Sequence, residues 1–146
     1  MTILWSAILS FFLLSSSLWE TDFEKAKEEA KSEHRCILLN FSGSDWCGPC
    51  IRMHKEIFES TTFTDYSSEH LVLVNADFPR LKKNSLSPNQ QKKNDQLADT
   101  YNSEGKFPLT LLLTADGKIL KTWEGLPPVS ADGFTSQVKA IVDANK

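Results

Sequence analysis

Two cysteines, Cys47 and Cys50, are separated by only two residues in the stretch Trp46-Cys47-Gly48-Pro49-Cys50. Thiols at this spacing can close a small disulfide ring or open to a dithiol, and such pairs exchange electrons with other disulfides. A permanent structural disulfide is a weaker interpretation, because the short loop that it closes removes little entropy from the unfolded chain. The pair is therefore the first candidate for redox chemistry.

The residues on either side of the pair predict where it lies. An apolar, β-prone run at 36–41 precedes it, and a helix-prone run without Gly or Pro follows at 51–58. The first turn of a helix has unpaired N–H groups and a partial positive charge, which stabilise a thiolate. We therefore expect Cys47, at the turn, to be the nucleophile. Cys50, one turn into the helix, is expected to be the less accessible, resolving thiol.

The stretch from Trp46 to Cys50 resembles the active site of the thioredoxin superfamily, in which Cys-Gly-Pro-Cys is the form typical of thioredoxin itself. A bare Cys-x-x-Cys also occurs in metal sites, but the preceding strand, the following helix and Trp46 favour redox chemistry. The segment 58–63 is similar instead to exported relatives, including the C-terminal reductase domain of the thiol:disulfide interchange protein DsbD. The resemblance covers residues 20–146 and implies that Trp46, Gly48 and Pro49 shape the site.

A second part of the resemblance is the pair Phe107-Pro108, just before a predicted strand. Pro108 resembles the family's cis-proline, which faces the disulfide. The backbone of Phe107 would then pair with an extended substrate, a one-rung form of β-strand addition. The family usually has Thr directly after this proline, whereas here Leu109 stands between Pro108 and Thr110.

Asn40 is the main departure from the family. Thioredoxin places a buried Asp on this strand behind the second cysteine, and Asn40 aligns with it if the loop holds one extra residue. A neutral amide cannot take a proton from Cys50, so water or another carboxylate must do so. Asp45, Glu56 and Asp77 are the candidates.

Cys36 and His54 are the other residues whose types could do chemistry. Cys36 begins an expected buried strand, which predicts a small apolar filler; pairing between chains is the alternative for an odd thiol. His54 could share a helix face with Cys50, but a structural zinc site takes four ligands. We therefore expect neither a metal site nor a cofactor.

The size of the chain, 146 residues, suits one domain. The net charge of −3 has mixed signs and gives no electrostatic case for nucleic acid binding. Three cysteines are too few for a disulfide-stapled scaffold.

The N-terminal residues 2–19 carry no charged side chain, which predicts a signal peptide over 1–19. A cleaved leader would leave a mature protein that starts near Leu18 to Glu20. A membrane anchor is the first alternative, although eighteen helical residues span about 27 Å, just short of a bilayer core of about 30 Å. A buried helix is the second. Residues 20–146 would form the thioredoxin-like domain.

Hydrophobic patterning predicts the remaining elements, with Thr21 and Glu24 as a capping box for the first helix. In chain order they are a helix at 21–33, strand 36–41, a helix ending near 60, a short helix or turn at 61–69, strand 71–77, helix 94–102, strands 108–114 and 119–123, and helix 131–144. This order predicts an α/β, thioredoxin-like fold, whose central mixed sheet has about four strands flanked by helices.

The segment 78–93 is different in character, because it contains two prolines and five basic residues. The basic residues are Arg80, Lys82, Lys83, Lys92 and Lys93. We interpret the segment as a long, solvated surface loop. The alternative is a docking surface for an acidic partner.

Together these features predict an exported thiol–disulfide oxidoreductase that reduces protein disulfides, because Gly48-Pro49 is the thioredoxin pair and only a helix N-terminus supports the Cys47 thiolate. The resemblance implies a periplasmic or otherwise secreted setting, with membrane anchoring as an alternative. It also implies a membrane thiol carrier or another reductase as electron donor. The competing functions are a disulfide oxidase or isomerase, and a non-catalytic binding or metal-delivery module.

Overall fold

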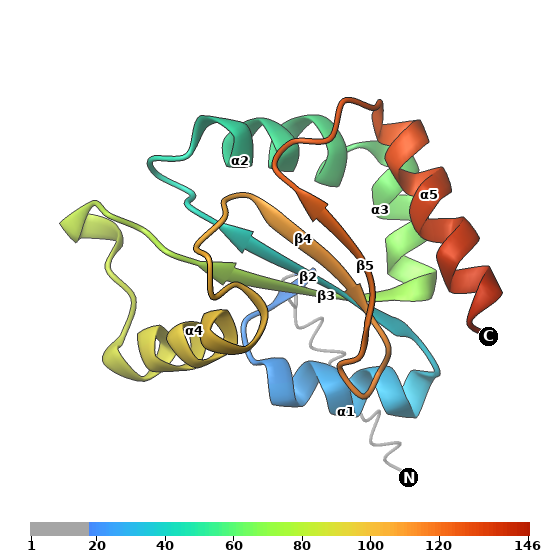
Figure 1. Cartoon of the computed structure of the whole chain (residues 1–146), viewed down its shortest axis with the longest axis horizontal. Coiled ribbons are helices and arrows are strands. Elements are labelled where there is room, and N and C mark those ends of the chain that lie inside the picture. Colours follow the sequence, from blue (N-terminus) through green and yellow to red (C-terminus); the bar gives the residue numbers. More distant parts are fainter. Residues whose placement is uncertain (1–17) are drawn as a thin grey trace, which may run out of the picture.

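The computed structural model describes residues 18–146, so the expected leader lies outside the described residues up to position 17. Five strands form one mixed sheet in the order β1-β3-β2-β4-β5 (Figure 1). The strands are β1 (Trp19–Glu20), β2 (Cys36–Ser42), β3 (Leu71–Asp77), β4 (Leu109–Leu113) and β5 (Ile119–Glu124). β1, β3 and β2 are parallel, whereas β4 and β5 form an antiparallel hairpin at the edge. The predicted α/β fold with a mixed sheet is confirmed.

Helices cover both faces of this sheet (Figure 1). One face carries α1 (Phe23–Glu33) and α4 (Pro88–Tyr101), and the other carries α2 (Gly48–Met53), α3 (Thr61–His70) and α5 (Ala131–Ala144). A wider, π-type turn, η1 (His54–Phe58), prolongs α2 close to its predicted end, and a 3-10 turn, η2 (Lys82–Asn84), interrupts the loop before α4.

The two cores follow from the alternation of side chains along buried strands. In β2, Ile37 and Leu39 belong to the core beneath α1 and α4, whereas Leu38 belongs to the core beneath α2, α3 and α5. All three side chains are fully buried. A strand that is buried on both faces reads as a continuous apolar run, which is why β2 and β3 are evident in the sequence.

Two helix starts differ from the prediction. Asp22, not Thr21, caps α1, because its carboxylate accepts the backbone N–H groups two and three residues further on. α4 begins at Pro88 rather than at residue 94, with Ser87 as its N-cap. The surface loop is therefore shorter than predicted. It covers 78–87, and residues 88–93 belong to the helix. Proline fits the first helical position because the N–H that it lacks has no intrahelical partner there.

The sheet also has one strand more than expected. β1 consists of only two residues, and Trp19 and Glu20 pair with Leu73 and Val74 of β3. Trp19, which the sequence places in the leader, thus lies in the sheet. Within residues 18–146, no helix is both long and apolar enough to cross a membrane.

Candidate active site

The two cysteines of the motif lie where β2 passes into α2. A four-residue loop, 43–46, follows the strand, and Cys47 is the N-cap of the helix. Its Sγ is bonded to Sγ of Cys50 and also accepts the backbone N–H of Cys50, at 3.3 Å from N to S. One of the unpaired N–H groups of the helix start thus points at this sulfur.

Exposure does not distinguish the two thiols in this oxidised form. Cys47 is 5% exposed and Cys50 is 3% exposed, so the expected difference in accessibility is negligible here. Their positions do differ, because Cys47 precedes the helix and Cys50 lies within its first turn. Between them, Gly48 and Pro49 are exposed and form the outer surface of the turn.

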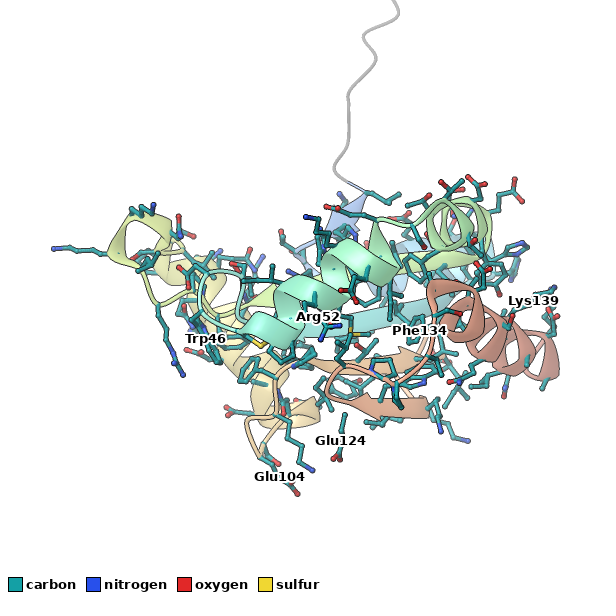
Figure 2. The ribbon with its side chains drawn as sticks, turned by 90° about the horizontal axis from the view of Figure 1, so that it is seen from above. Trp46, Arg52, Glu104, Glu124, Phe134 and Lys139 are labelled. Atoms are coloured by element: carbon teal, nitrogen blue, oxygen red, sulfur yellow. A yellow bond between two sulfur atoms is a disulfide. The ribbon has the colours of Figure 1, made fainter. Side chains whose placement is uncertain are left out.

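Trp46 packs beside the disulfide and is held on several sides. Its indole Nε1 donates to the backbone carbonyl of Phe78 at 2.7 Å. The guanidinium of Arg80 stacks on the indole ring, with Cζ 3.6 Å from the ring centroid. The ring of Phe107 packs edge-on against the indole, with the two ring centroids 5.4 Å apart. Figure 2 shows Trp46 at the N-terminal end of α2, with the segment 78–87 extending beyond it.

Phe107 and Pro108 lie at the same end of the sheet as the cysteines, because Leu109 at the start of β4 pairs with Phe41 near the end of β2. The Phe107–Pro108 peptide bond is cis, as the resemblance implies. Pro108 is buried, and its carbonyl accepts the N–H of Gly125. Among residues 18–146, no hydrogen bond occupies the backbone N–H or C=O of Phe107, so both are available to a substrate strand.

A neutral hydrogen-bond network forms the floor of the site. Asn40 on β2 donates from Nδ2 to Oδ1 of Asn75 on β3, at 3.0 Å. Its Oδ1 accepts the hydroxyl of Thr110 on β4, also at 3.0 Å, and that hydroxyl lies 3.7 Å from Sδ of Met53 in α2. Asn40 and Thr110 are 5% and 0% exposed. Asn40 thus donates one amide N–H and accepts one hydroxyl within the sheet, and a neutral amide cannot accept a proton from a thiol.

The three candidate carboxylates are all engaged elsewhere. Asp45 accepts two backbone N–H groups of the loop 78–87, and these bonds, with the amide of Asn84, lower the pKa of its carboxyl. Glu56 forms an exposed ion pair with Arg52. Asp77 accepts the backbone N–H groups of Ser44, in the loop before Trp46, and of Phe78. Within the described chain, none of the three hydrogen-bonds to the second cysteine.

Phe78 and Arg80 complete the surroundings of Trp46, and sequence reasoning did not place them there. The signal was the parallel pairing of β2 and β3, whose carboxyl ends lie at the same edge of a sheet. Ser42 pairs with Asp77, and the N–H of Phe78 donates to the carbonyl of Ser42 at 2.8 Å. Residues that follow the two strands are therefore neighbours, although they are more than thirty positions apart.

Cys36 and His54 are not part of this arrangement. Cys36 is at the other end of β2, partly buried against the core, and burial raises the pKa of its thiol. His54 is exposed and lies 3.3 Å from Glu59, Nε2 to Oε1. Over residues 18–146, no three His, Cys, Asp or Glu side chains are grouped as metal ligands would be.

A disulfide at a helix N-terminus, at the end of a mixed sheet and beside a cis-proline, defines a thiol–disulfide oxidoreductase of thioredoxin type. Comparison with known proteins agrees: the Thioredoxin-like domain family matches residues 23–140, and the chain belongs to this family.

One relative and one solved structure support this assignment with more detail. The disulfide bond reductase DsbH of Chlamydia pneumoniae is 37% identical over 124 residues, which cover 85% of this chain and 72% of that protein. A solved structure of DsbH oxidoreductase superposes with a TM-score of 0.77 at 35% identity, covering 86% of this chain and 83% of that one. The oxidised C-terminal domain of DsbD from Neisseria meningitidis shares the fold at 20% identity, with a TM-score of 0.54 and coverage of 80% and 90%.

Proposed function

We propose that this oxidoreductase reduces disulfides of proteins outside the cytoplasm, with Cys47 as the attacking thiol and Cys50 as the resolving one. The observation that carries the proposal is the N-cap position of Cys47, whose sulfur faces the N–H of Cys50 at 3.3 Å. A thiolate is stabilised at this position. The relative DsbH, which is named a disulfide bond reductase, supports the reducing direction.

The reaction starts from the dithiol. The Cys47 thiolate attacks one sulfur of the substrate disulfide, whose second sulfur leaves as a thiolate, and a mixed disulfide forms. Cys50 then loses its proton and attacks Sγ of Cys47, which releases the first substrate sulfur. Two electrons have passed to the substrate, and the enzyme is left with the Cys47–Cys50 disulfide. Phe107 supplies free backbone groups that can hold the substrate as an added strand.

The reducing direction follows from how little supports the Cys47 thiolate. Reducing and oxidising members of such families differ by about 150 mV, or about 7 kcal/mol for two electrons. A helix N-terminus contributes about 0.3–2 kcal/mol. Among the described residues, no cationic side chain donates to Sγ of Cys47, and Arg52 pairs instead with Glu56. The disulfide is then the comparatively stable form, so the dithiol is a good reductant.

The setting proposed for this activity is outside the cytoplasm, because the uncharged run at 2–19 predicts a leader. In an oxidising compartment the dithiol of a reductant is continually oxidised to the disulfide. A membrane thiol carrier or another reductase must then supply electrons to the Cys47–Cys50 pair.

Reduction of insulin disulfides tests the activity, and equilibration with glutathione tests its direction. We expect turnover that is lost in Cys47→Ser, and a potential well below about −150 mV. A potential above that value would contradict the reducing direction and favour an oxidase. A protein that turns over equally well after Cys47→Ser would contradict the whole assignment.

Trapping tests the roles of the two thiols. Cys50→Ser should accumulate disulfide-linked adducts with client proteins through Cys47, because the resolving step is missing. Gels without reductant should show the adducts, and added reductant should remove them. The matched control is Cys50→Ser with Cys36→Ser, which should trap as well. Loss of adducts in that control would mean that Cys36 is the nucleophile.

A further inference from the structure

The segment 78–87, which we call the basic arm, carries charge of one sign at the end of the sheet where α2 begins. It holds three basic residues, Arg80, Lys82 and Lys83, and no acidic one. The whole chain has a net charge of −3, so the rest of it carries −6. Figure 1 shows the arm, in yellow-green, extending beyond the sheet on the side where α2 begins. A positive projection on an otherwise acidic protein is thus located at the active-site end.

The arm is fixed to the loop that holds the motif. The carboxylate of Asp45 accepts the N–H groups of Arg80 and Leu81 at 2.9 and 3.0 Å. It also accepts the side-chain amide of Asn84, at 2.9 Å. Together with the stacking of Arg80 on Trp46, these bonds set the position of the arm relative to Cys47. A substrate held at Cys47 therefore meets the arm in one arrangement.

The cations at the end of the arm have no partner among the described residues. Lys82 and Lys83 are exposed, and no ion pair or side-chain hydrogen bond joins them to residues 18–146. Lys93, which follows the arm in α4, is by contrast bound to Asp22 at 2.8 Å. Next to the two free lysines, Leu81 is 48% exposed. The end of the arm thus presents two unpaired charges and one apolar side chain to solvent.

We propose that the basic arm binds an acidic segment of the substrate polypeptide that flanks the disulfide under attack. The inference rests on the proposed reductase function and adds a preference among its substrates. Lys82 is two residues beyond Arg80, at most about 7 Å along the chain, and an extended substrate advances about 3.3 Å per residue. Acidic residues a few positions from the substrate cysteine can therefore reach Lys82 and Lys83, with an apolar neighbour against Leu81.

The proposed recognition is electrostatic, and it affects the association of substrate and enzyme rather than the thiol–disulfide exchange step. Charge complementarity at an exposed rim mainly raises the rate of encounter, and salt screens it over about 10 Å at 0.1 M ionic strength. We therefore expect a threefold to tenfold preference for acidic substrates at low salt, and little preference at high salt.

Three disulfide-bonded peptides test this, identical except for three residues beside one cysteine that are Glu, Gln or Lys. The second-order rate constant is measured with the reduced full chain at low and high salt. We expect the order Glu, Gln, Lys at low salt, with the differences lost at high salt. Lys82→Gln with Lys83→Gln should abolish the preference and leave the rate on the Gln peptide unchanged. The matched control, Lys118→Gln with Lys121→Gln, removes the same charge from the β4–β5 hairpin and should keep the preference.

The possible outcomes separate the two proposals. Equal rates on the three peptides at low salt, with the protein active, would overturn the inference alone. Loss of the preference in the hairpin control as well would overturn it too, because net charge rather than the arm would then be responsible. Failure to reduce even the Gln peptide would overturn the proposed reductase function. All four lysines are exposed, so the variants should fold, and thermal unfolding checks this.

Discussion

Asn40 makes the floor of this active site neutral. Its amide is held between Asn75 and Thr110, and the candidate carboxylates nearby bind other groups. A thiol that must lose its proton during resolution then has no buried base beside it within the described chain. We infer that water takes the proton of Cys50, at a rate that a closer base would raise.

The variant Asn40→Asp tests this view. It should speed the resolution of a mixed disulfide near neutral pH by about ten- to a hundredfold, at or below the lower end of the range for general base catalysis. Quenched-flow analysis of a mixed disulfide with a model thiol measures that rate. An unchanged rate in a folded variant would mean that another group already accepts the proton.

The same variant carries a stability cost whose pH dependence has a definite sign. Burial raises the pKa of a carboxyl, and the protonated acid can still donate to Asn75. The unfolded carboxyl titrates near about pH 3.9, so the cost grows as pH rises above that value. It should reach about 1–3 kcal/mol. Urea unfolding at pH 4 and pH 7 checks this and shows where rate comparisons are valid.

Gly43 is the residue on which the position of Trp46 depends. A Cβ built at Gly43 would collide with Cε2 of the Trp46 indole, so the ring would have to move. Gly43→Ala should therefore cost about 1–3 kcal/mol of unfolding free energy. Gly48→Ala is the matched control, because a Cβ there meets nothing within 4 Å; its change should stay within about 1 kcal/mol. Equal stability of the two variants in urea would contradict the close packing of Trp46.

Among the elements, those with strong local patterns were predicted well. The bounds of β3 and α5 agree with the sequence prediction, since a doubly buried strand and a strongly amphipathic helix leave clear patterns. β1 was missed because two residues carry no periodicity, and only a partner from a distant strand makes them a strand. The start of α4 was missed because Ser87-Pro88 was interpreted as loop, although serine before proline is a typical helix start.

The site was predictable to a similar degree. The strand–turn–helix placement of Cys47 and Cys50 and the cis bond before Pro108 follow from local sequence and resemblance. The contacts of Arg80 and Phe78 with Trp46 do not, because they depend on which strands are neighbours in the sheet. A topological map of the sheet, rather than a longer motif, would have revealed them.

The basic arm should respond to acid through Asp45. Hydrogen bonds from the N–H of Arg80 and from Asn84 lower the pKa of this carboxyl. A depressed pKa means that the stability it contributes is present above the unfolded pKa, about 3.9, and is lost as pH falls through the folded value. The amide NMR signals of Arg80 and Leu81 should then titrate with a midpoint below about 3.9. In Asp45→Asn the titration should vanish; a midpoint above 3.9 in the native chain would contradict the bonds.

Trp19 lies within the predicted leader, 1–19, but it also packs into the folded domain. Its ring centroid lies 5.0 Å from that of Phe58, and its backbone pairs with Leu73. We therefore expect the mature protein to keep Trp19 and to start at Leu18 or just before it. Intact-mass measurement of exported protein tests this. A start after Trp19 would contradict it, and a full-length mass in the membrane fraction would favour an anchor.

The neutral floor also determines how many protons accompany the electrons. With Asn40, Asn75 and Thr110 in place, oxidation of the dithiol releases protons from the two thiols only. When two protons are released with two electrons, the midpoint potential falls by about 59 mV per pH unit. Once Cys47 is ionised in the dithiol, only one proton is released and the slope is half as large. A plot of potential against pH should then bend only where the two thiols ionise. Asn40→Asp should add a further bend, because the pKa of its carboxyl would depend on whether the cysteines are oxidised.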